Sequence, residues 1–177
     1  MHKRGFTMDS GINREKLLQI MQKYGNEAQQ ITAILHDVNN ASGKNYVDEQ
    51  WVALISETIG VPVSKIYELI TFYSMLSTKP RGRCLVEICQ STPCHFRRAQ
   101  QVVGWFEEEL GIKNGETSSD GEFTLGRTSC VGACDVGPVA KIGDDVFGDL
   151  TRDKVASIIK SYRDNKPELR EGLICQN

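Results

Sequence analysis

Four cysteines arranged as two close pairs are the residues of this chain that could do chemistry. Cys89 and Cys94 enclose four residues, whereas Cys130 and Cys134 enclose three. Four thiolates brought together from two loops can hold a metal ion or an iron–sulfur cluster. A cluster with two irons takes two thiolates at each iron, which suits two pairs on separate loops. The spacing therefore favours a two-iron cluster over other occupants.

Small residues within and after the pairs would let the main chain come close to the sulfur atoms. Ser91 lies in the first pair, Gly132 and Ala133 lie in the second, and Gly137 follows shortly after. Such residues allow backbone N–H groups to point at thiolates and stabilise their negative charge. A helix expected to begin at His95 would add the favourable end of its dipole.

Three other uses of the same cysteines stay open at this point. A structural zinc site also takes four cysteines, although its usual pairs enclose two residues. The chain would then be a zinc-stabilised adapter whose helical part binds a partner. A disulfide or a thiol–disulfide redox site would need an oxidising compartment or a two-residue spacer. The cysteines could also be buried together by coincidence.

Two further cysteines fall outside this set. Cys84 and Cys89 also enclose four residues, so a competing register exists. Cys84 lies early in a predicted strand, where side-chain alternation places it inside the sheet, and we expect a buried and inert thiol there. Cys175 has no partner at ligand spacing, and we interpret it as a bystander.

The other neighbours of the cysteines are expected to have ordinary structural roles. His95 could replace a cysteine in one class of cluster, but with four cysteines present we expect it at the surface or behind a ligand. Arg97 and Arg98 could moderate the charge of a cluster, yet solvent exposure is the default expectation. Trp51 and Trp105 lie on apolar helix faces and are expected to pack in cores.

The elements that precede the first pair are predicted to be four short amphipathic helices. Apolar residues recur at spacings of three and four in the segments 14–24, 28–38, 48–59 and 63–76. Gly25, a break over 39–43 and Gly60 separate them, and Asp48 is the expected N-cap of the third. Residues 1–80 are therefore predicted to form a helical N-terminal domain.

Short strands are predicted to deliver the cysteines. After a turn-rich segment at 79–82, the β-prone stretches 83–88 and 123–129 lead directly to Cys89 and Cys130. Each pair would thus follow the end of a strand.

The remaining pattern completes a mixed sheet with helices. A helix is expected from His95 to Leu110, a hairpin at Gly143-Asp144, and a last helix after the cap residue Thr151. The order β-α-β-β-β-α predicts a mixed α/β (α+β) domain. We place that domain at residues 81–165 and a loose tail at residues 166–177.

Composition bounds what the chain can do. With 177 residues of which 40% are hydrophobic, it can bury a core without a disulfide scaffold. Lys and Arg number 21 against 23 Asp and Glu, so no basic excess indicates nucleic-acid binding. No stretch reaches the length of a membrane span, and the first residues lack the apolar core of a signal peptide. We therefore expect a cytoplasmic protein without direct membrane insertion.

Nucleotide-binding motifs are missing from the sequence. No G-x-G-x-x-G follows a predicted strand, no Walker loop occurs, and there is no second cysteine set. The chain is therefore not expected to bind NAD or flavin itself. A cluster passes single electrons and cannot accept a hydride, so nicotinamide chemistry would need a flavin on another polypeptide. The sequence thus predicts a subunit or carrier without catalytic residues of its own.

Together, these residues resemble the small thioredoxin-like 2Fe-2S subunit of the NADH-oxidising module of complex I. The same family is shared with NAD-linked and electron-bifurcating hydrogenases and with formate dehydrogenases. The resemblance covers nearly the whole chain, and besides the four cysteines it includes Ile70-Thr-Phe-Tyr73, Pro80-Arg-Gly82, Ser129 to Cys134, Gly137-Pro138, Asp145-Val-Phe-Gly148 and Leu150-Thr151.

The resemblance implies a thioredoxin-like 2Fe-2S ferredoxin domain preceded by a small helical-bundle domain. It implies that Cys89, Cys94, Cys130 and Cys134 hold one 2Fe-2S cluster. It also implies docking onto a flavoprotein subunit that binds FMN and NADH, beside further iron–sulfur or catalytic subunits. The expected role is that of an electron-transfer subunit of an NAD(H)-dependent oxidoreductase. It would exchange single electrons with that FMN in a hetero-oligomer of the complex I, hydrogenase, formate dehydrogenase or electron-bifurcating type.

Three positions depart from the pattern of that family. Arg98 stands where the family often has glycine, and Gln90 and Pro93 stand where smaller residues are usual. None of the three is an expected ligand. Each could alter the reduction potential of a cluster or the surface that meets a partner.

Overall fold

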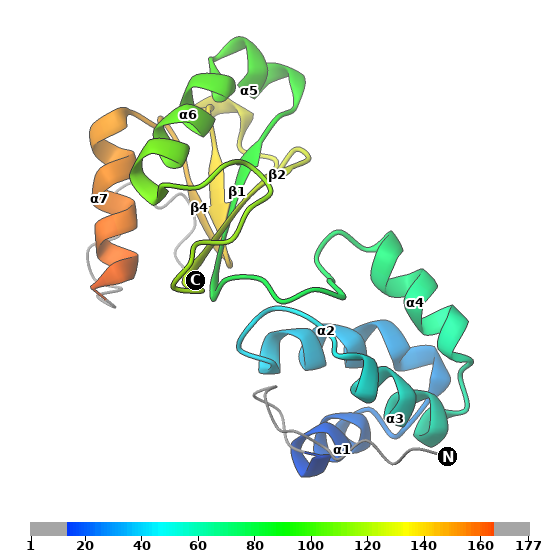
Figure 1. Cartoon of the computed structure of the whole chain (residues 1–177). Helices are drawn as coiled ribbons and strands as arrows, with labels where there is room; N and C mark the ends of the chain where they lie inside the picture. Colours follow the sequence, from blue (N-terminus) through cyan, green and yellow to red (C-terminus); the bar gives the residue numbers. More distant parts are fainter. Residues whose placement is uncertain (1–13, 165–177) are drawn as a thin grey trace. The chain divides into compact units, whose positions relative to one another are not determined.

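The computed structural model describes residues 14–164 (Figure 1). The predicted tail at 166–177, with Cys175, lies outside the described residues. The chain divides between Arg81 and Gly82 into two compact units, each with its own hydrophobic core. None of the helices within the described range combines the length and the apolar character needed to cross a membrane.

The first unit is built from short helices. They are α1 (Arg14–Lys23), a 3-10 turn (Ala28–Gln30), α2 (Ile31–Ala41), α3 (Glu49–Ile59) and α4 (Val63–Phe72). Their apolar faces meet in one core, whose fully buried members include Leu17, Met21, Ile34, Leu35, Val38, Ile55 and Ile66. Most of the recurring apolar positions in the sequence therefore mark the buried helix faces, as predicted, although Leu18 and Val63 are exposed.

The predicted ends of α3 are confirmed. The Asp48 carboxylate accepts a hydrogen bond from the Gln50 N–H at 2.8 Å, which satisfies one of the unpaired donors of the first turn. Gly60 ends the helix in a left-handed conformation with φ of 76°. Both residues were identifiable from the sequence because capping chemistry depends on residue type.

Two other helix boundaries differ from the prediction. The predicted break at 39–43 starts two residues or more before the helix ends, because α2 continues to Ala41. Ser42 still donates its N–H to the Val38 oxygen at 3.1 Å, so the helical hydrogen bonds run past the asparagines. Conversely, α4 ends at Phe72 although the apolar pattern continues to Leu76, which is buried beyond the end of the helix. A residue that is buried after the end of a helix can continue the apolar spacing of that helix, although the backbone there is no longer helical.

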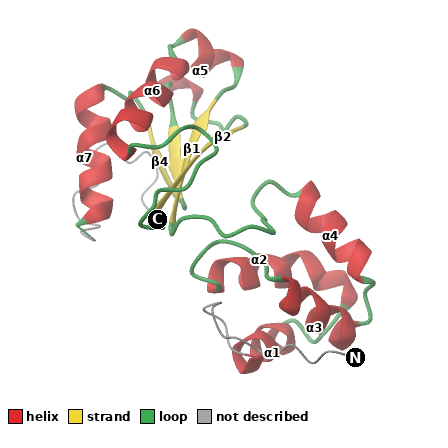
Figure 2. Cartoon of the chain, in the orientation of Figure 1, coloured by secondary structure: helices red, strands yellow, loops and turns green. Residues whose placement is uncertain are grey.

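The second unit combines a four-stranded sheet with helices. Its elements are β1 (Cys84–Cys89), α5 (Thr92–Phe96), α6 (Ala99–Leu110), β2 (Phe123–Thr128), a 3-10 turn (Cys134–Val136), β3 (Ala140–Ile142), β4 (Asp145–Phe147) and α7 (Arg152–Arg163). Figure 2 shows α6 and α7 beside the strands, and both helices share one core with the sheet. The predicted mixed α/β order is confirmed, as are the β3–β4 hairpin and the Thr151 cap of α7.

The pairing of the strands determines where the cysteine loops begin. The order in the sheet is β2-β1-β3-β4, and β3 runs antiparallel to both of its neighbours. β1 and β2 are parallel, with Cys89 opposite Thr128. Parallel strands end at the same edge of a sheet, so the loops that follow β1 and β2 start next to each other.

Candidate metal centre

The structure places the four predicted ligands on these two loops. Cys89 is the last residue of β1 and Cys94 lies in α5, while Cys130 follows β2 and Cys134 opens the 3-10 turn. Cys89 and Cys94 are each only 1% exposed. Cys130 is exposed and Cys134 is half-buried. One pair is therefore shielded from water, and the other reaches the surface.

The cysteines meet as two pairs. Sγ of Cys130 lies 3.5 Å from Sγ of Cys134, and the Cys94 thiol donates a hydrogen bond to Cys89. The pairs are near enough to interact electrostatically, since the charge of Cys134 acts on Cys94 and that of Cys89 acts on Cys134. Between residues 14 and 164, no group of three or more His, Cys, Asp or Glu side chains is arranged closely enough to hold a single metal ion. The structure thus brings together two neighbouring thiol pairs and not four sulfurs on one centre.

Backbone N–H groups point at the sulfurs, as the small residues around the pairs suggested. Gly132 donates its N–H to Cys130 Sγ at 3.4 Å. Cys89 accepts from the N–H groups of Ser91 and Val131, and Cys94 accepts from that of Val139. Val131 and Val139 could not be identified beforehand, because an N–H donor depends on loop conformation and not on residue type. Such donors stabilise negative charge on sulfur.

The thiols differ in how readily they lose their protons. Burial raises the pKa of Cys89, but hydrogen bonds from the Ser91 N–H and the Cys94 thiol outweigh it, and the pKa lies below its ordinary value. Burial and the hydrogen bond donated to Cys89 raise the pKa of Cys94 to about 11. The hydrogen bond of Cys134 to Cys130, followed by burial, raises the pKa of Cys134. Of these three thiols, Cys89 alone has a lowered pKa, so it loses its proton more readily than Cys94 or Cys134.

Two glycines allow the second loop to pack closely. A Cβ at Gly137 would lie 3.2 Å from Cys94 Sγ, so a side chain here would press on a predicted ligand. A Cβ at Gly148 would lie 2.7 Å from the Val136 oxygen. The neighbouring Asp149 N–H donates to that oxygen at 2.6 Å. The role of Gly137 was predicted, whereas Gly148 appeared only within a matching stretch of the related family.

Arg97 reaches from the first cysteine loop to the second. Its Nη1 donates to the backbone oxygens of Asp135 at 2.6 Å and of Gly137 at 3.3 Å. Arg97 is exposed, as the default expectation had it, but its guanidinium also joins the two loops, which was not predicted. Helical periodicity reports which residues share a face, but it carries no information about a loop far along the chain.

The helix predicted to start at His95 is in fact two helices. α5 contains both Cys94 and His95, and α6 begins at Ala99. Arg98 separates them with φ of 67°, a left-handed conformation that interrupts the helix. The expected helix dipole starting at His95 is thus wrong. Arg98 occupies the place where the related family often has glycine, the residue best suited to this conformation.

The other expectations for neighbouring side chains are confirmed. Cys84 is 6% exposed in the core of the sheet, and burial raises the pKa of its thiol. His95 is exposed. Trp51 is buried in the helical unit, and Trp105 packs half-buried against the core of the second unit. Cys84, Trp51 and Trp105 therefore contribute to packing.

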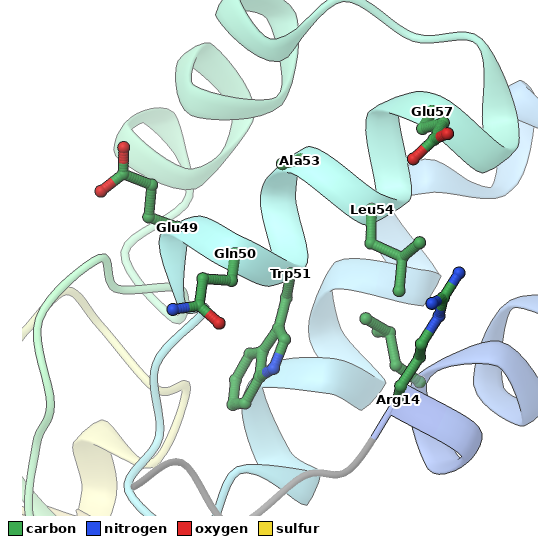
Figure 3. A pocket seen from close by; sticks show the side chains of 8 residues that line it. Arg14, Glu49, Gln50, Trp51, Ala53, Leu54 and Glu57 are labelled. Carbon is green, nitrogen blue, oxygen red and sulfur yellow. The ribbon is translucent and has the colours of Figure 1, made fainter. Parts of the chain in front are cut away.

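A separate pocket of about 610 Å³ lies in the helical unit (Figure 3). It is lined by Arg14, Leu17, Glu49, Gln50, Trp51, Ala53, Leu54 and Glu57. In Figure 3, Leu54 extends from α3 toward Arg14 at the start of α1, and the Trp51 ring lies to the left of them. The lining contains no cysteine, so this pocket is no part of the thiol site.

Comparison with known proteins relates the chain to iron–sulfur proteins. The model of the family described as thioredoxin-like [2Fe-2S] ferredoxin matches residues 17–163. One NADH-quinone oxidoreductase subunit from Pseudomonas aeruginosa is 36% identical over 119 residues, which cover 67% of this chain and 72% of that protein. The subunit of the same name from Rickettsia conorii is 32% identical over 162 residues, which cover 90% and 96% of the two chains.

A solved structure shares the fold. The NAD+-reducing [NiFe]-hydrogenase in its air-oxidised state superposes with a TM-score of 0.67 at 20% sequence identity. The match covers 78% of this chain but only 23% of the hydrogenase chain. At that identity, the likeness concerns the fold alone.

Proposed function

Because this chain belongs to the thioredoxin-like [2Fe-2S] ferredoxin family, we propose that it is an electron-transfer subunit whose one cluster is held by Cys89, Cys94, Cys130 and Cys134. The observation that carries the proposal is the meeting of two thiol pairs at the ends of the parallel strands β1 and β2. When bound, such a cluster accepts and releases one electron at a time.

The residues present fit a two-iron cluster. Two neighbouring pairs would supply two thiolates to each of two irons, whereas a structural zinc ion takes all four sulfurs around one centre. N–H groups directed at Cys89, Cys94 and Cys130 suit sulfurs that keep a negative charge. The missing side chain of Gly137 leaves room beside Cys94 Sγ.

The two pairs have different parts in this account. Cys89 and Cys94 are buried, so they would hold their iron away from water. Cys130 is exposed, so electron exchange with a partner is proposed on the side of the second loop. The first pair anchors the site in the sheet, and the second presents it to the surface.

The partner is proposed to be a flavoprotein subunit that binds FMN and NADH, beside further iron–sulfur or catalytic subunits. NADH gives up a hydride, which a one-electron carrier cannot take, so a flavin must divide the two electrons. The chain has no dinucleotide-binding motif, and its relatives are named as subunits of NADH-quinone oxidoreductase. We propose that the chain exchanges single electrons with the FMN of such a partner, in the cytoplasm, where thiols stay reduced.

Reduction by NADH tests this division of labour. The purified chain alone is expected to keep its visible absorbance when NADH is added. Adding the flavoprotein subunit from the same source should let NADH bleach that absorbance. Bleaching without the flavoprotein would contradict the proposal, and so would a colourless protein, which is the result expected for a zinc-stabilised adapter.

A further inference from the structure

The guanidinium of Arg97 connects the two cysteine loops. Arg97 is the C-cap that follows α5, the helix that carries Cys94, and its Nη1 donates to the oxygens of Asp135 and Gly137 at 2.6 and 3.3 Å. These two carbonyls lie on either side of Val136 in the loop that carries Cys130 and Cys134. Hydrogen bonds from a charged donor are stronger than those from a neutral one.

The same loop is held from another direction. The Val136 oxygen accepts the Asp149 N–H at 2.6 Å, and Gly148 leaves room for this approach. That contact ties the loop to the end of the β3–β4 hairpin. Arg97 supplies a different connection, because it ties the loop to the helix of the other cysteine pair.

Gly137 packs closely against its neighbours, so the Arg97 contact with this loop depends on where Gly137 lies. A Cβ placed on Gly137 would lie 3.2 Å from Cys94 Sγ and 3.5 Å from Cδ of Arg97. Gly137 therefore packs closely against both the Cys94 sulfur and the arginine stem. A shift of the Arg97 side chain would act on the loop at Gly137, and this loop packs against that sulfur.

We propose that Arg97 is a positioning residue that fixes the second cysteine pair relative to the first. The inference rests on the proposed function, since it concerns how the four proposed ligands are brought into register for one cluster. Both hydrogen bonds come from one nitrogen, Nη1, whose two N–H groups are held in the plane of the guanidinium. A lysine carries the same charge on a compact, strongly hydrated ammonium at the end of a flexible stem, so it does not hold two N–H groups in a fixed plane.

Three variants distinguish a positioning role of Arg97 from a simple effect of its positive charge. Arg97→Met removes the charge and the donors, Arg97→Lys keeps the charge alone, and Arg98→Gln removes an equal charge from the adjacent residue. We expect both Arg97 variants to lose the cluster to an iron chelator about tenfold faster than the wild type, as is usual when a partner of a metal ligand is removed. Their reduced forms should also show an altered electron spin resonance. Arg98→Gln should match the wild type in both measurements.

Other outcomes would overturn the inference in recognisable ways. Wild-type behaviour of Arg97→Met would remove any positioning role. Arg97→Lys could instead hold its cluster as well as the wild type, while Arg97→Met and Arg98→Gln weaken it equally. In that case only the positive charge of Arg97, and not its position, would contribute to retention of the cluster. If Arg97→Met does not fold, the comparison of Arg97→Lys with the wild type decides the question. A wild type without iron and sulfide would instead overturn the proposed function, and this inference with it.

Discussion

The four cysteines differ in environment although one site is proposed for them. Cys89 and Cys94 are buried at the end of β1 and in α5, and N–H donors from three residues point at their sulfurs. Cys130 is exposed and receives the Gly132 N–H. The spacing in the sequence was enough to select these residues, but not to tell the shielded pair from the accessible one. That difference depends on how deeply each loop packs.

Alanine substitution tests the ligand assignment one residue at a time. Alanine at Cys89, Cys94, Cys130 or Cys134 is expected to lower the iron content of the purified protein by about tenfold or more, because a lost ligand should cost at least as much as a lost partner of a ligand. Cys84→Ala is the matched control, since Cys84 lies in the sheet core. Iron and sulfide assays check the result. Loss of the cluster in Cys84→Ala, with retention in Cys94→Ala, would show that the competing register is the true one.

Arg98 carries conformational strain that glycine would remove. Its φ of 67° costs a residue with a side chain about 1–2 kcal/mol, while the flexibility of glycine in the unfolded chain offsets part of the gain. Arg98→Gly should therefore raise the free energy of unfolding by about 0.5–1 kcal/mol, measured by urea denaturation. Arg98→Ala removes the same side chain and keeps the strain, so it should not stabilise the protein. Equal effects of both variants would contradict this explanation.

At the scale of elements, strands and caps were easier to predict than loops. β1, β2 and the last hairpin follow β-prone stretches and a Gly-Asp turn, and Asp48 and Thr151 cap helices as their types suggest. The split between α5 and α6 was missed because arginine is not a residue type that indicates a left-handed backbone conformation, which Arg98 adopts. The Arg97 contact was missed because it joins segments that are distant in sequence. Local chemistry is visible in a sequence, whereas contacts between loops depend on the folded backbone.

Gly148 tests how the second cysteine loop is supported. A Cβ at this position would lie 2.7 Å from the Val136 oxygen, so Gly148→Ala should force the loop away. We expect a loss of about 1–3 kcal/mol in the free energy of unfolding, together with a lower cluster yield. Gly126→Ala, in β2, is the control, because a Cβ there meets no atom within 4 Å. If the two variants unfold at the same urea concentration, the close packing of Gly148 against Val136 does not contribute to the free energy of unfolding.

An ion pair joins α1 and α2 and should make the stability of the helical unit depend on pH. Asp37 accepts from Lys23 Nζ and from the Tyr24 hydroxyl, each at 2.8 Å. The hydrogen bond from Lys23 outweighs burial and holds the pKa of Asp37 below its ordinary value of 3.8. A carboxylate with a lowered pKa stabilises the fold above that ordinary value, and the contribution is lost as the pH falls through the lowered pKa.

The pH dependence can be measured with Asp37→Asn. At pH 7 this variant should unfold at a lower urea concentration than the wild type, and the difference should shrink once the pH falls below about 3.8. Glu57→Gln, an exposed change on α3, should track the wild type at every pH. A difference for Asp37→Asn that stays constant down to pH 2 would mean that the lost contact is not electrostatic.

At the scale of the whole molecule, the chain is proposed to contribute one part of a larger reaction. Its family carries a [2Fe-2S] cluster, and its relatives are subunits of NADH-oxidising complexes. The thiol site lies wholly in the second unit, on two loops that start from parallel strands. The sequence contains no motif for binding a nicotinamide or a flavin. Hydride chemistry is therefore proposed to take place on a partner, with this chain passing single electrons.

The metal and sulfide content of the purified chain, combined with electron spin resonance after one-electron reduction, is the decisive measurement for the proposed cluster. We expect about two irons and two acid-labile sulfides per chain and a resonance that appears only on reduction, as for a single [2Fe-2S] centre. Zinc without sulfide, in a protein that shows no resonance on reduction, would contradict it.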